Sequence, residues 1–433
     1  MDVGGEWKRV KLEYLVRTQK GFAFKSAWYS EIGRPIVKVS DFTQDSIGTD
    51  SLTMIPDEIA ERHLRYELKE GDIVIQTVGS WPSNPASVVG KCIRVPHAAH
   101  KALLNQNAVR LSPNGDVENR YLYYLLRSPH FGDYIVGTAQ GAASQAAITL
   151  DSIRAYNFRL PSLITQRKIA SILSAYDDLI ENNLRRIKIL EEMAQALYRE
   201  WFVKFRFPGH EKVRMVDSPL GKIPEGWEAV PMENVCNRIT DGAHLSPKSV
   251  DAGYPMASVK DMHNWGVNVY TCRKISEDDY KKLVRNDCKM RKNDVLIAKD
   301  GSYLKHCFVV EQDLDVALLS SIAILRPSER IRPHVLAMTL REPDVKTRMK
   351  GYVSGAALPR IILKEFRKFT IIVPPIGLQN EWAEDAEPMI KFCWRLLDKN
   401  TNLRQTRDLL LPKLISGELD VSDLKIQIPE EAA

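Results

Sequence analysis

Residues 166–205 read QRKIASILSAYDDLIENNLRRIKILEEMAQALYREWFVKF and contain no glycine or proline. Mostly apolar side chains recur along this stretch at alternating spacings of four and three, which is the heptad pattern of a coiled-coil seam. The seam positions are Ile169, Leu173, Tyr176, Ile180, Asn183, Ile187, Leu190, Ala194, Leu197 and Trp201. The pattern predicts one long helix whose apolar stripe packs against another helix.

A second stretch with the same spacing follows Pro374 and Pro375. Its seam positions are Trp382, Ala386, Met389, Cys393, Leu396, Asn400, Leu403, Arg407, Leu410 and Leu414. Pro388 and Pro412 lie within it, and each removes a backbone donor and can kink a helix. We therefore expect a second long helix that is less regular than the first.

An antiparallel alignment of the two seams places Asn183 opposite Asn400, with Ile169 opposite Leu414. A buried asparagine pair can select a register, because any other register leaves an amide unpaired in the seam. A parallel arrangement would instead place Asn183 opposite Leu396. The alternative is that each asparagine faces solvent. At about 1.5 Å per residue the first seam extends about 50 Å, the length of roughly 15 base pairs of DNA.

The rest of the chain is an internal repeat. The segment from Gly33 to Asp41 matches the segment from Gly253 to Asp261, and Gly71–Ile75 matches residues 293–297. The order of the matches is kept while the offset drifts by a few residues, as expected for two copies with loop insertions. The β-branched runs 36–39, 73–78 and 295–298 predict strands, and residues 121–127 and 335–341 predict short helices. Each copy is thus expected to be a mixed domain that ends in a long helix.

Composition excludes several classes of protein. Of 433 residues, 44% are hydrophobic and 27% charged, as in ordinary globular proteins. The net charge of +6 is compatible with a polyanionic partner; the basic excess lies in residues 211–375, whereas residues 376–433 are acidic. The six cysteines show no metal-knuckle spacing and are expected to be reduced thiols. With no apolar segment of signal-peptide or membrane-span length, we expect a cytoplasmic protein.

Several segments resemble the DNA-specificity subunits of type I restriction–modification enzymes. One is Lys20-Gly21-Phe22-Ala-Phe24-Lys25-Ser26, and another is Thr240-Asp241-Gly242-Ala-His244-Leu-Ser-Pro247. The most specific runs from Leu160-Pro161 through Gln166-Arg-Lys-Ile169 to Trp201-Phe202 and Pro208-Gly209, and residues 411–418 also fit. The first two segments differ from each other, so the contacts of one copy cannot be transferred to the other.

The resemblance implies an α+β chain of two α/β target-recognition domains, residues 1–160 and 211–375, in a pseudo-two-fold repeat. Two long coiled-coil helices, within residues 161–210 and 376–433, would separate them, and the seam alignment above makes these helices antiparallel. Each domain would read one half of a bipartite double-stranded DNA site, and the helices would set the spacer and dock two methyltransferase subunits. S-adenosylmethionine would belong to those subunits, and ATP and Mg would belong to the restriction subunits that also join the complex. The chain itself would have no catalytic or metal-binding residues and no membrane partner.

Base edges and phosphates are bound by basic, amide and hydroxyl side chains. Such residues cluster after the strand-like runs of both copies, although a solvated turn is the alternative for each. The candidates in the first copy are Lys20, Lys25, Lys38, Ser80, Trp81, Asn84, Gln106, Asn107 and Gln145. Those in the second copy are His244, Lys248, Lys260, Lys299, Ser302, Tyr303, Lys305 and Arg360. Trp81 and Tyr303 would either stack on DNA or close their own loops.

Motifs for catalysis by this chain are weak. There is no phosphate-binding loop of the Gly-x-x-x-x-Gly-Lys-Ser/Thr type, and Val373-Pro-Pro-Ile376 lacks the polar first residue of an amino-methyltransferase motif. Pro56-Asp57 followed by Glu67-Leu68-Lys69 matches a permissive Mg²⁺-nuclease pattern. A stand-alone Mg²⁺-dependent nuclease is therefore the alternative hypothesis, and a coiled-coil scaffold that never touches DNA is a third.

Overall fold

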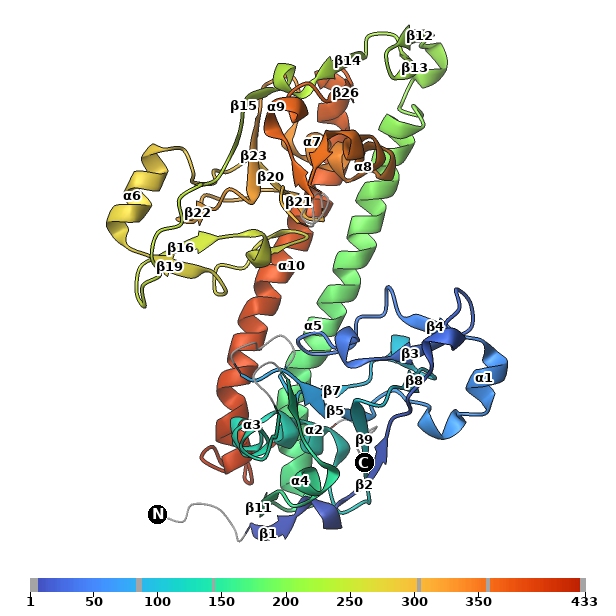
Figure 1. Cartoon of the computed structure of the whole chain (residues 1–433), viewed down its shortest axis with the longest axis vertical. Coiled ribbons are helices and arrows are strands. Elements are labelled where there is room, and N and C mark those ends of the chain that lie inside the picture. The colour runs from blue at the N-terminus through green and yellow to red at the C-terminus, as the bar shows by residue number, and fades with distance from the viewer. Residues whose placement is uncertain (1–6, 83–87, 142–144, 302–304, 356–358, 429–433) are drawn as a thin grey trace. The chain divides into compact units, whose positions relative to one another are not determined.

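The structure, a computed structural model, describes residues 7–82, 88–141, 145–301, 305–355 and 359–428. The chain divides into two compact units, residues 1–180 with 401–433 and residues 181–400. The boundaries fall within two long helices, α5 (Leu163–Tyr198) and α10 (Ile376–Ser416), drawn in green and red in Figure 1. Each unit therefore holds one copy of the repeat and one segment of each long helix.

In the first unit a four-stranded sheet of order β2-β9-β5-β7 lies beside a three-stranded sheet of order β4-β3-β8. The strands are β1 (Lys8–Lys11), β2 (Val16–Lys20), β3 (Arg34–Val37), β4 (Thr53–Ile55), β5 (Ile73–Gln76), β6 (Val78–Gly79), β7 (Cys92–Arg94), β8 (Leu103–Leu104), β9 (Ala108–Pro113), β10 (Ala146–Ala147) and β11 (Asn157–Leu160). The short helices are α1 (Asp57–Glu61), α2 (Asn119–Arg127), α3 (Pro129–Gly137) and α4 (Leu150–Arg154).

The second unit has sheets of order β15-β23-β20-β21 and β19-β16-β22. Its strands are β12 (Met215–Ser218), β13 (Gly221–Pro224), β14 (Glu228–Pro231), β15 (Cys236–Asp241), β16 (Tyr254–Ala257), β17 (Met262–His263), β18 (Gly266–Val267), β19 (Arg273–Ile275), β20 (Val295–Ala298), β21 (Cys307–Val309), β22 (Ala317–Leu318), β23 (Ile322–Pro327), β24 (Val353–Ser354), β25 (Arg360–Ile361) and β26 (Thr370–Val373). Its short helices are α6 (Glu277–Arg285), α7 (Pro333–Arg341), α8 (Pro343–Met349) and α9 (Leu363–Phe366).

The four-stranded and three-stranded sheets of one unit have the same strand order as those of the other, which confirms the internal repeat. β5 and β20 are inner strands of the four-stranded sheets, and all four residues of each are buried, which explains their apolar runs. β3 pairs with β8 in parallel, and β16 pairs with β22 in parallel. The helices predicted at residues 121–127 and 335–341 are present as α2 and α7.

The seam positions of both long helices are shielded from solvent. Ile169, Leu173, Tyr176, Ile180, Asn183, Ile187, Leu190, Leu197, Leu396, Asn400, Leu403, Leu410 and Leu414 are all buried or half-buried. Pro388 and Pro412 both lie within α10, which is one helical element from Ile376 to Ser416. The first helix ends in a π-helical turn, η7 (Arg199–Val203).

The asparagine register is also confirmed. In the second unit the Asn183 side-chain amide donates to the Asn400 carbonyl oxygen at 2.7 Å, and both residues are almost completely buried. In the first unit the Arg407 guanidinium pairs with Asp177, next to its predicted neighbour Tyr176. The seam is therefore antiparallel in each unit, and the alternative of solvent-facing asparagines is wrong.

Replacing both asparagines by leucine should stabilise the seam while loosening its register. Removing both polar partners together leaves no buried amide unsatisfied, so Asn183→Leu with Asn400→Leu should raise the unfolding free energy by about 1 kcal/mol. Chemical denaturation measures that gain. Spin labels at the exposed positions Leu184 and Lys399 should show a broader distance distribution than in the parent chain. A narrow, unchanged distribution would show that the apolar seam sets the register without the asparagines.

A glutamine in the first turn of each long helix forms hydrogen bonds with the domain that precedes the helix. The amide nitrogen of Gln166 donates to the Pro161 carbonyl oxygen at 2.9 Å, and its oxygen accepts from the Glu118 backbone at 2.8 Å. Glu118 is the N-cap of α2, so the first turn of α5 is joined to the start of a domain helix. This contact gives a structural reason for the Pro161 and Gln166 spacing.

Gln379, which is fully buried, repeats this arrangement in the second unit. It donates to the carbonyl oxygens of Pro374 and Arg330 and accepts from the Arg332 backbone, all within 2.9 Å. Gln379→Ala should lower the free energy of unfolding by about 2 kcal/mol, because it leaves buried backbone groups without partners. Thermal unfolding measures the loss, and the exposed Gln405→Ala is the matched control. Equal melting temperatures for the two variants would refute this role.

All six cysteines are buried and unpaired, in agreement with their scattered spacing. Burial raises the pKa of Cys236 and of Cys307 to about 12, so neither thiol is ionised near neutral pH. Within the described ranges, no helix combines the length and the apolar character needed to cross a membrane.

Candidate nucleic-acid interface

The candidates of the first copy gather at one edge of the four-stranded sheet. β2 ends at Lys20, antiparallel to β9, which begins at Ala108, so Lys20 and Asn107 lie at the same edge. β5 is also antiparallel to β9 and ends at Gln76, which brings the following segment with Ser80 and Trp81 to that edge. β10 pairs with β6, and the exposed Gln145 directly precedes β10. We call this edge the first polar edge.

The smaller sheet extends the first polar edge. Because β3 and β8 are parallel and the Asn105 backbone N–H donates to the Val37 carbonyl oxygen, Lys38 lies next to the turn that carries Gln106. The Lys38 ammonium donates to the Thr53 hydroxyl at 2.7 Å and lies 4.3 Å from the centre of the Tyr29 ring. Lys25 is exposed, with its ammonium 5.4 Å from the centre of the Trp28 ring. This edge therefore presents amides and aromatics beside its lysines.

The second copy forms an equivalent second polar edge. β15 ends at Asp241, β23 begins at Ile322 and β20 ends at Ala298, all at one end of the sheet. His244, Lys305 and Arg360 lie in the segments that follow or adjoin these strand ends and are exposed. Lys260 and Lys248 are also exposed, Lys260 in a 3-10 helix, η10 (Val259–Asp261), that begins two residues after β16.

Lys299 differs from the other candidates because it is buried. Its ammonium lies 2.5 Å from an Asp241 carboxylate oxygen, and the other oxygen of Asp241 lies 3.3 Å from the His244 ring. Arg360 lies 3.3 Å from Asp300 across the same edge. Lys299 is therefore buried and paired within this edge, whereas His244 and Arg360 are exposed on it.

Equivalent positions of the two polar edges carry different chemistry. The first edge has Lys20 and Thr77 where the second has Asp241 and Lys299. The backbones correspond. The Thr77 backbone N–H donates to the Asn107 carbonyl oxygen, and the Lys299 backbone N–H donates to the Ser321 carbonyl oxygen in the same way. One scaffold therefore carries two different sets of polar groups. The sequence analysis did not name Asp241 or Asp300 as candidates. The offset of 220 between the segments Gly33–Asp41 and Gly253–Asp261 would pair Lys20 with Thr240, and an irregularity in β15 brings Asp241 to the position of Lys20 instead.

At each polar edge a glycine lets two backbone segments pass within a short distance of each other. A Cβ on Gly21 would lie 2.0 Å from the Asn105 carbonyl oxygen, and one on Gly242 would lie 2.2 Å from that of Leu318. Both distances are far below van der Waals contact, so only glycine fits where the chain crosses the neighbouring turn. Asn84, Ser302 and Tyr303 lie outside the described residues.

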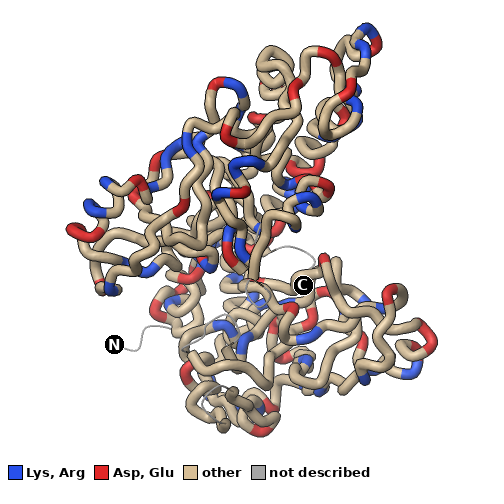
Figure 2. Tube along the Cα trace, turned by 45° about the horizontal axis from the view of Figure 1, so that its top comes forward, with Lys and Arg blue, Asp and Glu red and all other residues tan. Residues whose placement is uncertain are grey.

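Charges of both signs are interspersed along the trace of each unit (Figure 2).

The residues of the proposed nuclease pattern also include a basic neighbour. Arg34 contacts both carboxylates of the pattern, Asp57 and Glu67. The Arg34 guanidinium contacts Glu67 at 2.8 Å and Asp57 at 4.0 Å. An arginine thus takes the place that a cation would need, and across the described residues no group of three acidic, histidine or cysteine side chains has metal-binding geometry. The nuclease alternative has no support from this geometry.

Several known proteins are similar to this chain in sequence or in fold. The "Type I restriction enzyme MjaIX specificity subunit" of Methanocaldococcus jannaschii is 26% identical over 326 residues, covering 74% of this chain and 73% of the relative. The "Type I restriction enzyme EcoBI specificity subunit" of Escherichia coli is 22% identical over 446 residues, covering 97% and 87%. The crystal structure of a type I restriction–modification S subunit from M. genitalium has a TM-score of 0.54 at 15% identity, covering 96% and 98%.

The sequence profile of the "Type I restriction modification DNA specificity domain" matches residues 4–192 and 224–402. It matches twice, once on each copy of the repeat, and the two matches together account for most of the chain. The repeat, the two long helices and this double match agree, and the chain belongs to the family of type I restriction–modification DNA-specificity proteins.

Proposed function

We propose that this specificity subunit reads a bipartite double-stranded DNA site, with residues 1–160 reading one half and residues 211–375 the other. The observation that carries the proposal is the repeated polar edge, which has one backbone and two different sets of polar side chains. Different donors and acceptors recognise different base edges. A protein with two different reading surfaces should recognise a site with two different halves and not a palindrome.

The two long helices would set the spacer between the half-sites and dock two methyltransferase subunits. Those subunits would bring S-adenosylmethionine and the chemistry, and restriction subunits would bring ATP and Mg. Support comes from the relatives, each of which is named a specificity subunit of a type I restriction enzyme. This chain would then act by binding alone.

The deciding experiment maps methylated adenines across the genome with and without the gene for this chain. A two-part motif that disappears on deletion supports the proposal, and an unchanged methylation map refutes it. In a second assay the purified chain is incubated with Mg²⁺ and duplex DNA. DNA cleavage that Asp57→Ala abolishes would favour the nuclease instead, and binding that fails to weaken with salt would argue against phosphate contacts.

A further inference from the structure

A small hairpin occupies the same place in both copies, directly after the lysine-bearing segment of each polar edge. In the first copy it follows the 3-10 helix η3 (Val39–Asp41), and Phe42 bridges to Ile47. In the second copy it is β17–β18, in which Met262 pairs with Val267. The turn residue of the first hairpin is Asp45, and its equivalent in the second, 220 residues later, is Trp265.

In the first copy Asp45 joins the hairpin to the helices. One carboxylate oxygen lies 3.1 Å from Arg127 of α2 and 3.0 Å from Arg407 of α10, and the other lies 2.6 Å from Arg404. Arg407 is almost completely buried and also pairs with Asp177 of α5. Burial alone would raise the pKa of Asp45, but the three guanidinium groups lower it to about 2, so the carboxylate stays charged.

The second copy makes the same joint with different chemistry. Arg341 of α7, the equivalent of Arg127, lies over the buried Trp265 ring, 5.3 Å from its centre. The same guanidinium forms an ion pair with Glu191 of α5. Glu191 is the equivalent of Arg404, so the charge on the long helix is reversed between the two joints.

We propose that Asp45 and Arg341 are positioning residues for DNA reading, each joining the hairpin of its own copy to a long helix. The hairpin follows Lys38 or Lys260 within a few residues, so the joint controls where that part of the edge lies. This inference rests on the proposed function, because it assigns a role within the reading of each half-site.

Each joint also matches its own helix. An aspartate at the hairpin turn fits the arginines of α10, whereas it would face the carboxylate of Glu191 on α5. A tryptophan fits Arg341 but would leave Arg404 and Arg407 without Asp45. Buried charges that lose their partner are strongly unfavourable. Neither recognition domain could therefore take the other's position on the long helices without losing these contacts.

The test uses the full chain with its modification subunits and reads the genomic methylation motif of each variant. Asp45→Asn should broaden the motif in one half only, with affinity for the mapped duplex reduced about tenfold. Arg341→Gln should broaden the other half. Glu67→Gln and Asp287→Asn, which remove a charge from ion pairs elsewhere in the same two domains, are the matched controls.

A charge exchange tests the joint independently of folding losses. Glu191→Arg alone should broaden the second half of the motif. Glu191→Arg with Arg341→Glu restores the ion pair but not the contact with Trp265, so it should return the second half of the motif part of the way to that of the parent chain. If Asp45→Asn prevents the chain from accumulating, Arg404→Gln replaces it, since Asp45 keeps its other two arginines. Motifs unchanged in all joint variants, broadening in both halves at once, or a double variant no better than its singles would each overturn the inference. A wild-type chain without any two-part motif would refute the proposed function instead.

Discussion

Lengthening both long helices by one heptad should widen the gap between the two half-sites by about three base pairs. Seven residues inserted after Ile180 in α5, together with seven after Asn400 in α10, face each other in the antiparallel seam. The insertion preserves the heptad phase and adds about 10 Å of helix. At about 3.4 Å per base pair this corresponds to about three base pairs of spacer. The bases of both half-sites should stay the same, because neither polar edge is altered.

Methylation mapping of the inserted variant measures the spacer directly. A seven-residue insertion after Asn114, in the exposed connection between β9 and α2, is the control for added chain length. The control should keep the original motif. If the helix variant methylates the original spacing at its original efficiency, the helices do not determine the spacer.

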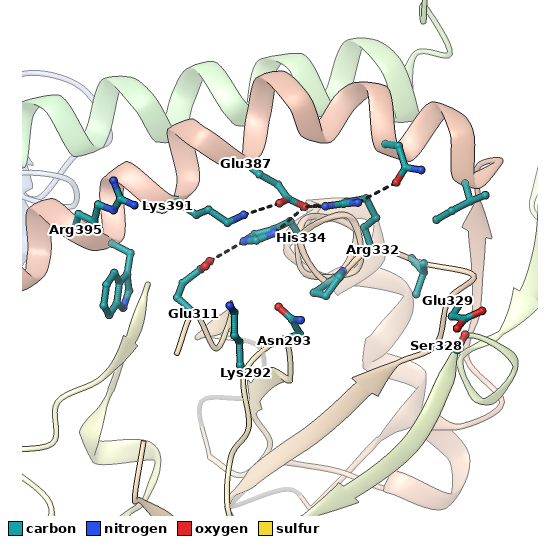
Figure 3. Close-up of a pocket in the computed structure, with 15 residues that line it drawn as sticks. Lys292, Asn293, Glu311, Ser328, Glu329, Arg332, His334, Glu387, Lys391 and Arg395 are labelled. Atoms are coloured by element: carbon teal, nitrogen blue, oxygen red, sulfur yellow. Dashed lines mark hydrogen bonds and ion pairs between the residues drawn. The ribbon is translucent and has the colours of Figure 1, made fainter. Parts of the chain in front are cut away.

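The second large effect concerns a buried charge cluster in the second unit, shown in Figure 3. The His334 ring lies 2.7 Å from Glu311 and 3.3 Å from Glu387. Glu387 also contacts Arg332 at 2.7 Å and Lys391 at 2.9 Å. Because His334 belongs to α7 and Glu387 to α10, the cluster joins the second recognition domain to the long helix, beside a pocket of about 780 Å³.

Glu387→Gln should destabilise the second unit by about 3 kcal/mol, since it leaves the buried His334 and the partly exposed Arg332 with one carboxylate fewer. Burial alone would raise the pKa of Glu387, but His334, Lys391 and Arg332 hold that pKa well below its ordinary value. The stabilisation from Glu387 is therefore present above its ordinary pKa of 4.5 and is lost as the pH falls through the lowered value.

His334 has the opposite pH dependence. Burial disfavours its charged form, but Glu311 and Glu387 raise its pKa above the ordinary value of 6.5. Its stabilisation is fully present below pH 6.5 and is lost as the pH rises through the raised value. The melting temperature should therefore fall over that window in the parent chain and stay flat in His334→Gln. The exposed His130→Gln is the control. Parallel pH profiles for His334→Gln and the parent would contradict the role of the cluster.

The long helices could be predicted from the sequence because their information is local and periodic. The spacing of four and three, the absence of glycine and proline in residues 166–205, and the two seam asparagines together specify helix, face and register. Repetition added a second kind of information. Segments such as Gly33–Asp41 and Gly253–Asp261 predicted two domains of one fold, since matched turns and buried runs dictate matched strands.

The roles of single polar residues were decided by the tertiary structure. Lys299 looks like a DNA-binding lysine in sequence, yet it is buried against Asp241, which lies 58 residues earlier in the chain. Asp45 lies in a plain polar turn, yet it binds Arg404, which is 359 residues away. Such pairings depend on which strand ends and helix faces meet, and periodicity within one segment carries no information on that. The sequence by itself therefore determined the helices, their register and the repeat, because these follow from local patterns of burial. Only the folded chain decided which charges face solvent and which neutralise each other, because an ion pair needs two groups that folding brings within a few ångströms.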